Sequence, residues 1–340
     1  MSPTAVTGRC LEGFDDPSFG SAQWNRLLTR GRSDLVFLTW EWQSAWWQCF
    51  GRGELLLMAV EREGEVVALA PLFTEAGMVY FVGSGGSDYL DFIGDVTRPE
   101  VLDALLQAAR ERVADFIGFV FYHVPESSAT AGHLAEAGAR LGLRLFNEGE
   151  LAAPALELVA QREVALAAPN KKSLVRHERH LSREAALSVT HLRAGEEILP
   201  HLEDFFAQHR DRWAATPHPS LFGDERQRRF YRRLTAVAAQ TGWLRFTRLD
   251  WKSRPIAFHY GVCYRENYLW YKPSFAIDLA RYSPGEVLLR QLLLAALAEG
   301  ARTFDFGLGE EQFKARFATQ VNQVRTWGLY APEALARNTA

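Results

Sequence analysis

The sequence predicts an α/β fold of two tandem domains, each a mixed, mostly antiparallel sheet flanked by helices. The first observation is size and composition: 340 residues, of which 48% are apolar and 23% charged, can form two hydrophobic cores. The second is that short strand-like runs alternate with longer helical stretches along the whole chain. The third is that the order of these elements in the first half recurs in the second, which suggests a duplicated unit.

The first half is expected to contain an aromatic-rich helical region followed by an antiparallel meander. In residues 19–50 the aromatic and leucine residues have helical spacing, and Trp40, Trp42, Trp46 and Trp47 must be largely packed. Strand-type runs follow at residues 54–60, 65–73, 78–82 and 88–93. Helices are then expected at 99–114 and 129–141, with a strand at 118–124 and an extended piece near 144–146. Helices should therefore cover both faces of a mixed sheet.

The second half begins with a strongly basic helical stretch. Pro169 and Asn170 precede a run, extending to Ala186, that is dense in lysine, arginine and histidine. We place the domain boundary just before it, with an N-terminal domain at 1–165 and a C-terminal domain at 166–340. The earlier pattern then repeats, with helices expected at 198–212, 224–241 and 284–300 and strands at 243–249, 255–264, 268–273 and 303–306.

Charge and cysteine content exclude several classes of protein. A formal net charge of -3 provides no overall attraction to nucleic acid, so DNA is not an expected partner. The three cysteines, Cys10, Cys49 and Cys263, are odd in number and far apart in the chain. This spacing argues against a disulfide framework and against a structural zinc site, and we expect no metal site.

No segment has the pattern of a targeting or membrane-spanning sequence. Residues 1–6 lack the basic stretch and apolar core of a signal peptide. The most apolar stretch, 287–298, is interrupted by Arg290 and Gln291. The sequence therefore predicts a cytoplasmic protein without stable membrane insertion.

The start of the helix expected at 284–300 is the most informative local pattern. Ser283 is predicted at the N-cap, Pro284 at the first helical position and Glu286 at the third, which together make a capping box. Free N–H groups at such a start can bind a pyrophosphate, and Arg281 can add a charged contact. The alternative is that Ser283 and Glu286 only cap a buried helix, with the glutamate where a phosphate would sit. The candidate cofactor-binding residues are Arg281, Ser283, Gly285 and Glu286.

Several stretches in a particular order resemble a known family. They are residues 40–50, 70–72, 87–91, 230–249, 282–285, 304–306 and 313–314, which span most of the chain. With these stretches the chain resembles the CelD/BcsL-type acetyltransferase-like proteins, which are relatives of the FemABX peptidyltransferases within the GNAT superfamily. The resemblance implies two tandem GNAT-like domains and transfer of an acyl group, with acetyl-CoA as donor, to an amine or hydroxyl. It further implies a small-molecule or glycan acceptor in a cell-envelope or exopolysaccharide pathway.

The resemblance also suggests where the donor would bind. In the superfamily the cofactor's pyrophosphate lies on the loop before the helix that starts here at Ser283. The usual acetyl-CoA loop has a basic or glutamine residue and two spaced glycines, whereas this chain has Arg281, one glycine, Gly285, and the acidic Glu286. Lys314 matches the place of a FemABX-type lysine that contacts the donor or the developing oxyanion, so it is a candidate catalytic residue. The alternative is a surface lysine paired with Glu310 or Glu311.

Acyl transfer needs groups that remove and supply protons, and four residues of the second half are candidates. Tyr271, Tyr282 and Asp305 are candidate catalytic residues because they lie in the strand, loop and helix around the expected donor site. His259, in an apolar strand, is a candidate substrate contact. The alternatives are that His259 is a satisfied core histidine and that the tyrosines are packing residues.

Two further groups are candidate substrate-binding residues. His209, Arg212 and Trp213 cluster at the end of a helix, and with the basic run 171–183 they can line a cleft for an anionic sugar, a lipid-linked intermediate or a tRNA phosphate. A solvated helix face is the alternative. In the first half, Asp88, Tyr89 and Asp91 follow a glycine-rich turn and are candidate contacts to an acceptor.

Three functional hypotheses follow from these observations. The first is an acetyl-CoA-dependent acyltransferase. The second is a FemABX-like transferase that uses aminoacyl-tRNA, in which the basic run binds tRNA. The third is a non-catalytic GNAT-like binding protein, which the acidic Glu286 favours.

Overall fold

The computed structural model describes residues 6–214 and 216–337, and these form two compact units. Unit 1 comprises Met1–Ala152 together with Asn322–Ala340, and unit 2 comprises Ala153–Val321. The chain therefore passes from unit 1 into unit 2 and back again. The domain boundary between residues 165 and 166 stays a prediction. Residues 1–5, most of the stretch that lacks a signal-peptide pattern, lie outside the described residues.

Unit 1 is built on a mixed sheet with the strand order β1-β2-β3-β4-β6-β13-β7, in which β5 pairs with β3. The strands are β1 (Thr7–Leu11), β2 (Glu54–Arg62), β3 (Glu65–Glu75), β4 (Met78–Phe81), β5 (Ile93–Gly94), β6 (Gly118–Pro125), β7 (Arg144–Glu157) and β13 (Gln320–Tyr330). The meander β1 to β4 is antiparallel, β4 and β6 are parallel, and β13 is antiparallel to β6. The last strand of the chain thus completes the first unit.

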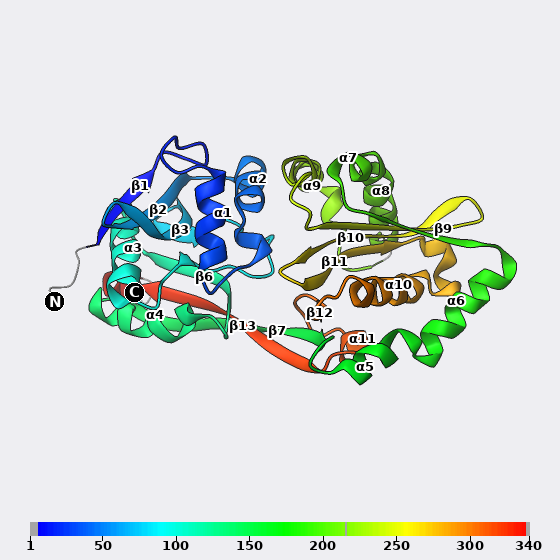
Figure 1. Ribbon diagram of the computed structural model, residues 1–340. Coiled ribbons are helices and arrows are strands. Elements are labelled where there is room, and N and C mark those ends of the chain that lie inside the picture. The colour runs from blue at the N-terminus through cyan, green and yellow to red at the C-terminus, as the bar shows by residue number, and fades with distance from the viewer. Residues whose placement is uncertain (1–5, 215, 338–340) are drawn as a thin grey trace. The chain divides into compact units, whose positions relative to one another are not determined.

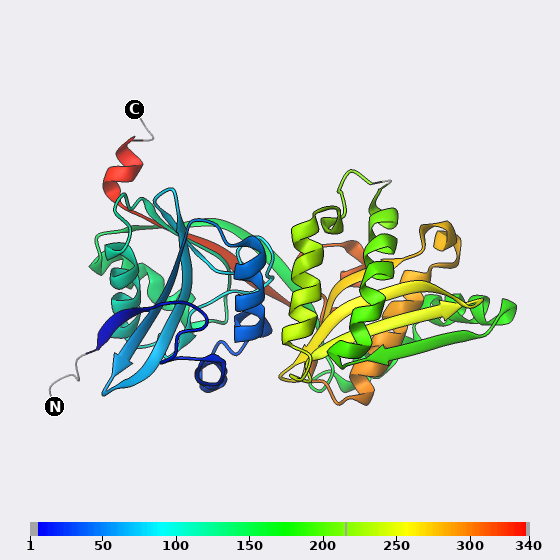
Figure 2. The same cartoon turned by 90° about the horizontal axis from the view of Figure 1, so that it is seen from above.

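Helices cover both faces of this sheet, as the sequence predicts (Figure 2). They are α1 (Ser21–Arg30), the short η1 (Val36–Leu38), α2 (Trp40–Phe50), α3 (Pro99–Glu111) and α4 (Ala129–Arg140), followed at the end of the chain by α12 (Pro332–Arg337). Trp42 and Trp46 of α2 are buried, and the Trp47 ring packs on Phe73 of β3. The predicted strand at 88–93 is wrong except at its last residue. Asp91 is buried there and accepts from the hydroxyls of Ser33, Ser128 and Thr130.

Unit 2 repeats the plan of unit 1, with the strand order β7-β12-β11-β10-β9-β8. Its own strands are β8 (Leu187–Leu192), β9 (Leu244–Trp251), β10 (Arg254–Tyr264), β11 (Asn267–Phe275) and β12 (Thr303–Asp305). β8 to β11 are antiparallel neighbours, β11 and β12 are parallel, and β12 is antiparallel to the last part of β7. The predicted fold class, an α/β fold with mixed and mostly antiparallel strands flanked by helices, is confirmed, and the strands of both units belong to one 13-stranded sheet.

The helices of unit 2 lie in two layers (Figure 1). One face of the sheet carries α7 (Gly195–Ile198), η3 (Leu199–His201), α8 (Leu202–Trp213), η4 (Leu221–Gly223) and α9 (Glu225–Val237). The other carries α5 (Arg162–Ala167), η2 (Ala168–Asn170), α6 (Lys172–Glu184), η5 (Ile277–Tyr282), α10 (Pro284–Ala298) and α11 (Gln312–Ala315). The predicted basic helix is therefore α6, and it packs against α10.

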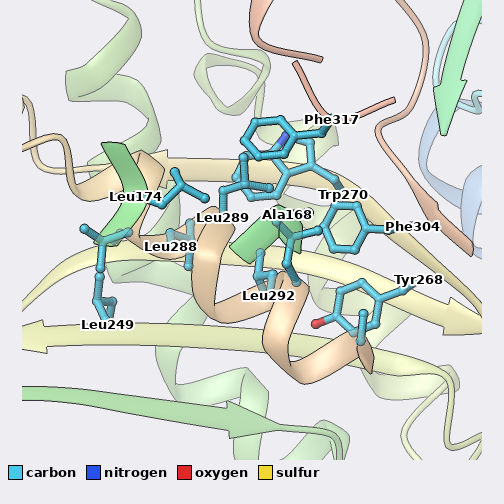
Figure 3. Close-up of a cluster of buried hydrophobic side chains, with 14 of the residues drawn as sticks. Ala168, Leu174, Leu249, Tyr268, Trp270, Leu288, Leu289, Leu292, Phe304 and Phe317 are labelled. Atoms are coloured by element: carbon cyan, nitrogen blue, oxygen red, sulfur yellow. The ribbon is translucent and has the colours of Figure 1, made fainter. Parts of the chain in front are cut away.

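The core of unit 2 lies between α10 and the sheet (Figure 3). Leu288, Leu289 and Leu292 of α10 are at most 3% exposed and meet Tyr268 and Trp270 of β11. Each fully buried leucine contributes about 1.5 to 3 kcal/mol, so this face of α10 fixes the helix firmly on the sheet. Within residues 6–214 and 216–337, no helix has the length and apolar character needed to cross a bilayer.

Candidate functional site

A pocket of about 190 Å³ opens in unit 2 between β11, the first turns of α10 and the α11 region. Its apolar wall consists largely of aromatic rings, and its polar wall carries two arginines and a glutamate. The lining residues are Arg212, Trp270, Pro273, Ser274, Phe275, Gly285, Glu286, Leu289, Phe313, Arg316 and Phe317. Three residues predicted from the sequence, Arg212, Gly285 and Glu286, therefore line one pocket.

The pocket lies where β11 extends beyond the end of its neighbour β12. The two strands pair only from Asn267 to Leu269, opposite Thr303 to Asp305. The rest of β11 continues to Phe275 and pairs only with β10 on its other side. Beyond Leu269, β11 is thus not paired with β12, and two of its backbone groups there bind side chains: the Tyr271 N–H donates to His259 Nε2 and the Pro273 carbonyl accepts from Arg212.

The helix start at the pocket differs in one respect from the prediction. Ser283 is the N-cap and Pro284 follows at the first helical position, as predicted, but the Ser283 side chain makes no capping hydrogen bond. Ser283 has φ 54°, in the left-handed region, and its backbone carbonyl accepts from the N–H of Glu286 at 3.0 Å. The predicted capping box is therefore wrong, because the Glu286 carboxylate binds other partners.

The Glu286 carboxylate joins three elements at the mouth of the pocket. His177 of α6 donates from Nδ1 to Oε2 at 2.8 Å, and Arg316 donates from Nη1 to Oε1 at 2.8 Å. Arg316 also donates from Nη2 to the hydroxyl of Ser173 at 2.8 Å. The carboxylate of Glu286, an anion that the protein itself supplies, thus lies beside the first turn of α10, where the helix dipole favours negative charge.

Arg281 and Tyr282 lie just before this helix. Arg281 Nη2 donates to the Tyr282 hydroxyl at 3.1 Å, and that hydroxyl donates to Glu184 at 3.1 Å. The Tyr282 ring is buried against His180 and Trp251. Neither residue lines the pocket, and Tyr282 has the contacts of a packing residue.

Lys314 of α11 is 3% exposed, which is rare for a lysine. Its Nζ donates to the carbonyls of Gly307 and Leu308 at 3.3 and 2.7 Å and lies 3.4 Å from that of Gly309. It also forms an ion pair with Glu311 at 2.7 Å. An ammonium has three N–H donors, and these four acceptors engage all of them. Lys314 therefore holds the 307–309 loop in this conformation.

Asp305 and Tyr271 belong to the sheet beside the pocket. Asp305 ends β12, and its Oδ1 accepts from the N–H of Gly307 at 2.8 Å, so it supports the same loop that Lys314 holds. Tyr271 is 7% exposed on β11, with the Lys272 ammonium 3.8 Å from its ring centroid. Neither side chain lines the pocket.

Arg212, at the end of α8, reaches the pocket from the opposite layer of helices. Its Nη1 donates to the carbonyl of Pro273 at 2.9 Å. Its guanidinium carbon lies 4.5 Å from the ring centroid of Phe275 and 5.2 Å from that of Trp213. Burial lowers the pKa of this guanidinium below its usual value.

His209 and Trp213 accompany Arg212 on α8 but do not line the pocket. His209 is 5% exposed, and its Nδ1 lies 2.8 Å from the Ser220 hydroxyl. Burial, followed by the charges of Arg212 and Lys272, lowers the pKa of His209 to about 3. His209 is thus neutral at physiological pH.

His259 has the surroundings of a core histidine. It is fully buried in β10, stacks on Trp270 at 5.4 Å, and its Nε2 accepts from the N–H of Tyr271 at 3.1 Å. Burial lowers its pKa to about 3. The neighbouring Gly261 gives it room, because a Cβ there would lie 2.1 Å from His259 Cε1.

The three predicted residues of unit 1 do not line this pocket, and their contacts are with residues of unit 1. Asp91 is fully buried and accepts from the hydroxyls of Ser33, Ser128 and Thr130. Tyr89 is 9% exposed and packs edge-on against Phe37, while Asp88 is partly buried. Burial raises the pKa of Asp91, whose contacts join its own segment to Ser33 and to the start of α4.

Sequence reasoning missed several residues of the site. Arg316 and His177, which hold Glu286, were not singled out, nor were the rings of Trp270, Phe275, Phe313 and Phe317. The aromatic spacing at 313 and 317, one helical turn apart, was the available signal for two of these rings.

Part of the chain that carries this pocket is similar to a known family. Residues 169–315 match the family model described as Acetyltransferase (GNAT) domain. The matched segment includes α10, β11 and β12 and most of the pocket residues. No curated protein matches the chain.

Solved structures with tandem domains share the fold. FemX is 11% identical, with 94% of this chain and 98% of that chain covered and a TM-score of 0.67. L-PGS from Bacillus licheniformis is 14% identical, with coverage of 87% and 93% and a TM-score of 0.53. A tandem GNAT protein from the clavulanic acid biosynthesis pathway is 12% identical, with coverage of 96% and 99% and a TM-score of 0.50. At these identities the likeness shows the fold alone.

Proposed function

We propose that the chain is an acyltransferase that transfers an acetyl group from acetyl-CoA to an amine or hydroxyl of a small-molecule or glycan acceptor. The observation that carries this proposal is the pocket beside the part of β11 that extends past β12, most of whose lining lies within the segment that matches the GNAT domain. We assign the acceptor to a cell-envelope or exopolysaccharide pathway and the protein to the cytoplasm, following the CelD/BcsL-type resemblance.

We place the chain-like arm of the acyl thioester beside the part of β11 that extends past β12. An extended ligand with amide groups can hydrogen bond to a strand edge as an added strand does. The rings of Trp270, Phe275 and Phe313 offer an apolar wall along the same edge. Binding of this kind orients the thioester carbonyl before the acceptor attacks.

The reaction is a direct transfer. The acceptor nitrogen or oxygen attacks the thioester carbonyl, the carbon–sulfur bond breaks, and the acceptor's proton leaves as the thiol is released. We assign Lys314 a positioning role, because its ammonium holds the 307–309 loop through three carbonyls. Tyr271, Tyr282 and Asp305 remain candidates for the proton-transferring groups.

The test is calorimetric titration of acetyl-CoA and CoA into the purified protein, with an Arg281→Glu variant beside it. We expect saturable binding that the added negative charge weakens, together with thiol release when amine and hydroxyl acceptors are supplied. Failure of acetyl-CoA and of longer acyl-CoA thioesters to bind would overturn the proposal and leave the non-catalytic hypothesis, which Glu286 at the helix start favours.

A second candidate is a transferase that uses aminoacyl-tRNA, and the surface of α6 favours it. Lys172, Arg176, Arg179 and Arg183 are all exposed on this helix, with Lys171 at its N-cap. Such a surface would bind phosphates with an affinity that falls steeply as salt rises. Filter binding of tRNA at 50 and 200 mM salt tests it, and weak, salt-independent retention would eliminate it.

A further inference from the structure

The two arginines of the pocket are in opposite electrostatic situations. Arg316 is neutralised by the Glu286 carboxylate and also binds Ser173. Arg212 has one carbonyl and two aromatic rings as its contacts, and no carboxylate within ion-pair distance among the described residues. A guanidinium has five N–H donors, so most of the hydrogen-bonding capacity of Arg212 is unused.

The surroundings of Arg212 are rich in positive charge and in donors. Arg212 and Lys272 together help to keep the neighbouring His209 neutral. The indole N–H of Trp213 is buried and has no hydrogen-bond partner among the described residues. A partly buried cation without a counter-ion is costly, so a protein usually retains one where a ligand supplies the opposite charge.

The rings around Arg212 also fix its orientation. Phe275 and Trp213 lie within 5.2 Å of the guanidinium carbon, and Phe275 lines the pocket beside it. Arginine stacked on aromatic rings keeps its planar fork in place, and that fork matches the two oxygens of a carboxylate. The small pocket volume of about 190 Å³ suits a compact planar anion on an apolar body.

We propose that the ligand of this pocket carries a carboxylate that binds the Arg212 guanidinium, with an apolar body lying on the rings of Trp270, Phe275 and Phe313. This inference rests on the proposed function only because both concern the same pocket. It restricts the substrate to one in which either the acyl group or the acceptor carries a carboxylate. Succinyl-CoA compared with acetyl-CoA, and an amino-acid acceptor compared with its amide, distinguish these two sources.

The test uses a matched pair of probes, 3-phenylpropionate and its neutral amide, on the intact chain. Calorimetry and thermal shift should show that the carboxylate binds and the amide does not, and that Arg212→Gln weakens carboxylate binding by about 10- to 100-fold. Arg254→Gln, at an exposed arginine paired with Asp278, is the control and should bind as the original protein does. If Arg212→Gln does not fold, Arg212→Lys keeps the charge and should still bind about 10-fold more weakly.

Equal binding of the acid and the amide, or undiminished binding by a folded Arg212 variant, would overturn the inference. A response to phenethyl phosphate without one to 3-phenylpropionate would also overturn it, in favour of a phosphoryl ligand. Because binding is measured without turnover, the inference and the acyltransferase proposal can fail separately. Carboxylate binding without acyl-CoA binding rejects only the enzyme, and acetyl transfer without carboxylate recognition rejects only this inference.

Discussion

The carboxylate of Glu286 lies 2.8 Å from Arg316 Nη1 and 2.8 Å from His177 Nδ1, at the first turn of α10. The chain thus places its own anion at a helix start that otherwise attracts phosphate groups. A ligand that brings a pyrophosphate to this turn must compete with Glu286 for Arg316.

Glu286→Gln is expected to tighten acetyl-CoA binding by about 3- to 10-fold. Without the negative charge of Glu286, both Arg316 and the positive end of the helix dipole can attract the phosphates of the ligand. Calorimetric titration measures the affinity. Glu266→Gln, at a 63% exposed glutamate in the β10–β11 turn, is the matched control. Weaker binding in Glu286→Gln would show that the carboxylate itself belongs to the donor site.

Lys314→Met is expected to lower the free energy of unfolding by about 2 to 4 kcal/mol, because three loop carbonyls lose their charged donor. Urea denaturation measures the change, and turnover per folded molecule shows whether Lys314 also acts in the reaction. Glu311→Gln removes the charge of the 59% exposed ion-pair partner and should lower the free energy of unfolding by less than about 1 kcal/mol. A loss as large as that of Lys314→Met would show that the ion pair, and not the carbonyl contacts, provides the stability.

His209 and His259 should make the protein less stable as the pH falls from about 6.5 toward 3. Both have a folded pKa of about 3, below the ordinary 6.5, so in this window the unfolded chain binds protons that the folded chain cannot. Each histidine lowers the free energy of unfolding by about 1.4 kcal/mol for every pH unit within this window. Melting temperatures between pH 4.5 and 7.5 should fall less steeply in His259→Gln, and an unchanged slope would refute the assignment.

Gly285→Leu is expected to block the pocket without unfolding unit 2. A Cβ at position 285 would lie 3.2 Å from the Phe275 ring, so a longer side chain fills the space where we place the ligand. Acetyl-CoA binding should fall at least about 10-fold, as a lost contact of 1.4 kcal/mol or more would give. Gly132→Leu, on a helix of unit 1 with open space around its Cβ, should bind normally, and normal binding by both variants would place the donor elsewhere.

Local patterns predicted the elements of the fold better than they predicted the partners of the site. Pro284 and Ser283 revealed the start of α10 because a proline and an N-cap act within one turn. The role of Glu286 was missed, because its partners His177 and Arg316 lie 109 and 30 residues away in the sequence. His259 was weighed as a core histidine or a substrate contact, and its full burial supports the first interpretation.

Long-range strand pairing was also beyond the reach of the sequence. The run 88–93 was predicted as a strand, yet Asp91 binds the hydroxyls of Ser33, Ser128 and Thr130, which lie 37 to 58 residues away in the sequence. Likewise, nothing in residues 320–330 indicates that β13 returns to pair with β6, some 200 residues earlier in the chain. Such pairings depend on the assembled sheet and not on local preference.

The return of β13 to unit 1 has a consequence for the order of assembly on the ribosome. Every residue of unit 2 has been synthesised once Val321 is in place, whereas unit 1 still lacks the strand that pairs with β6. Until β13 is available, unit 1 therefore exposes an open strand edge. A gene fragment encoding only residues 1–165 would leave that edge permanently uncovered, so aggregation of the fragment would be expected even if every helix in it formed.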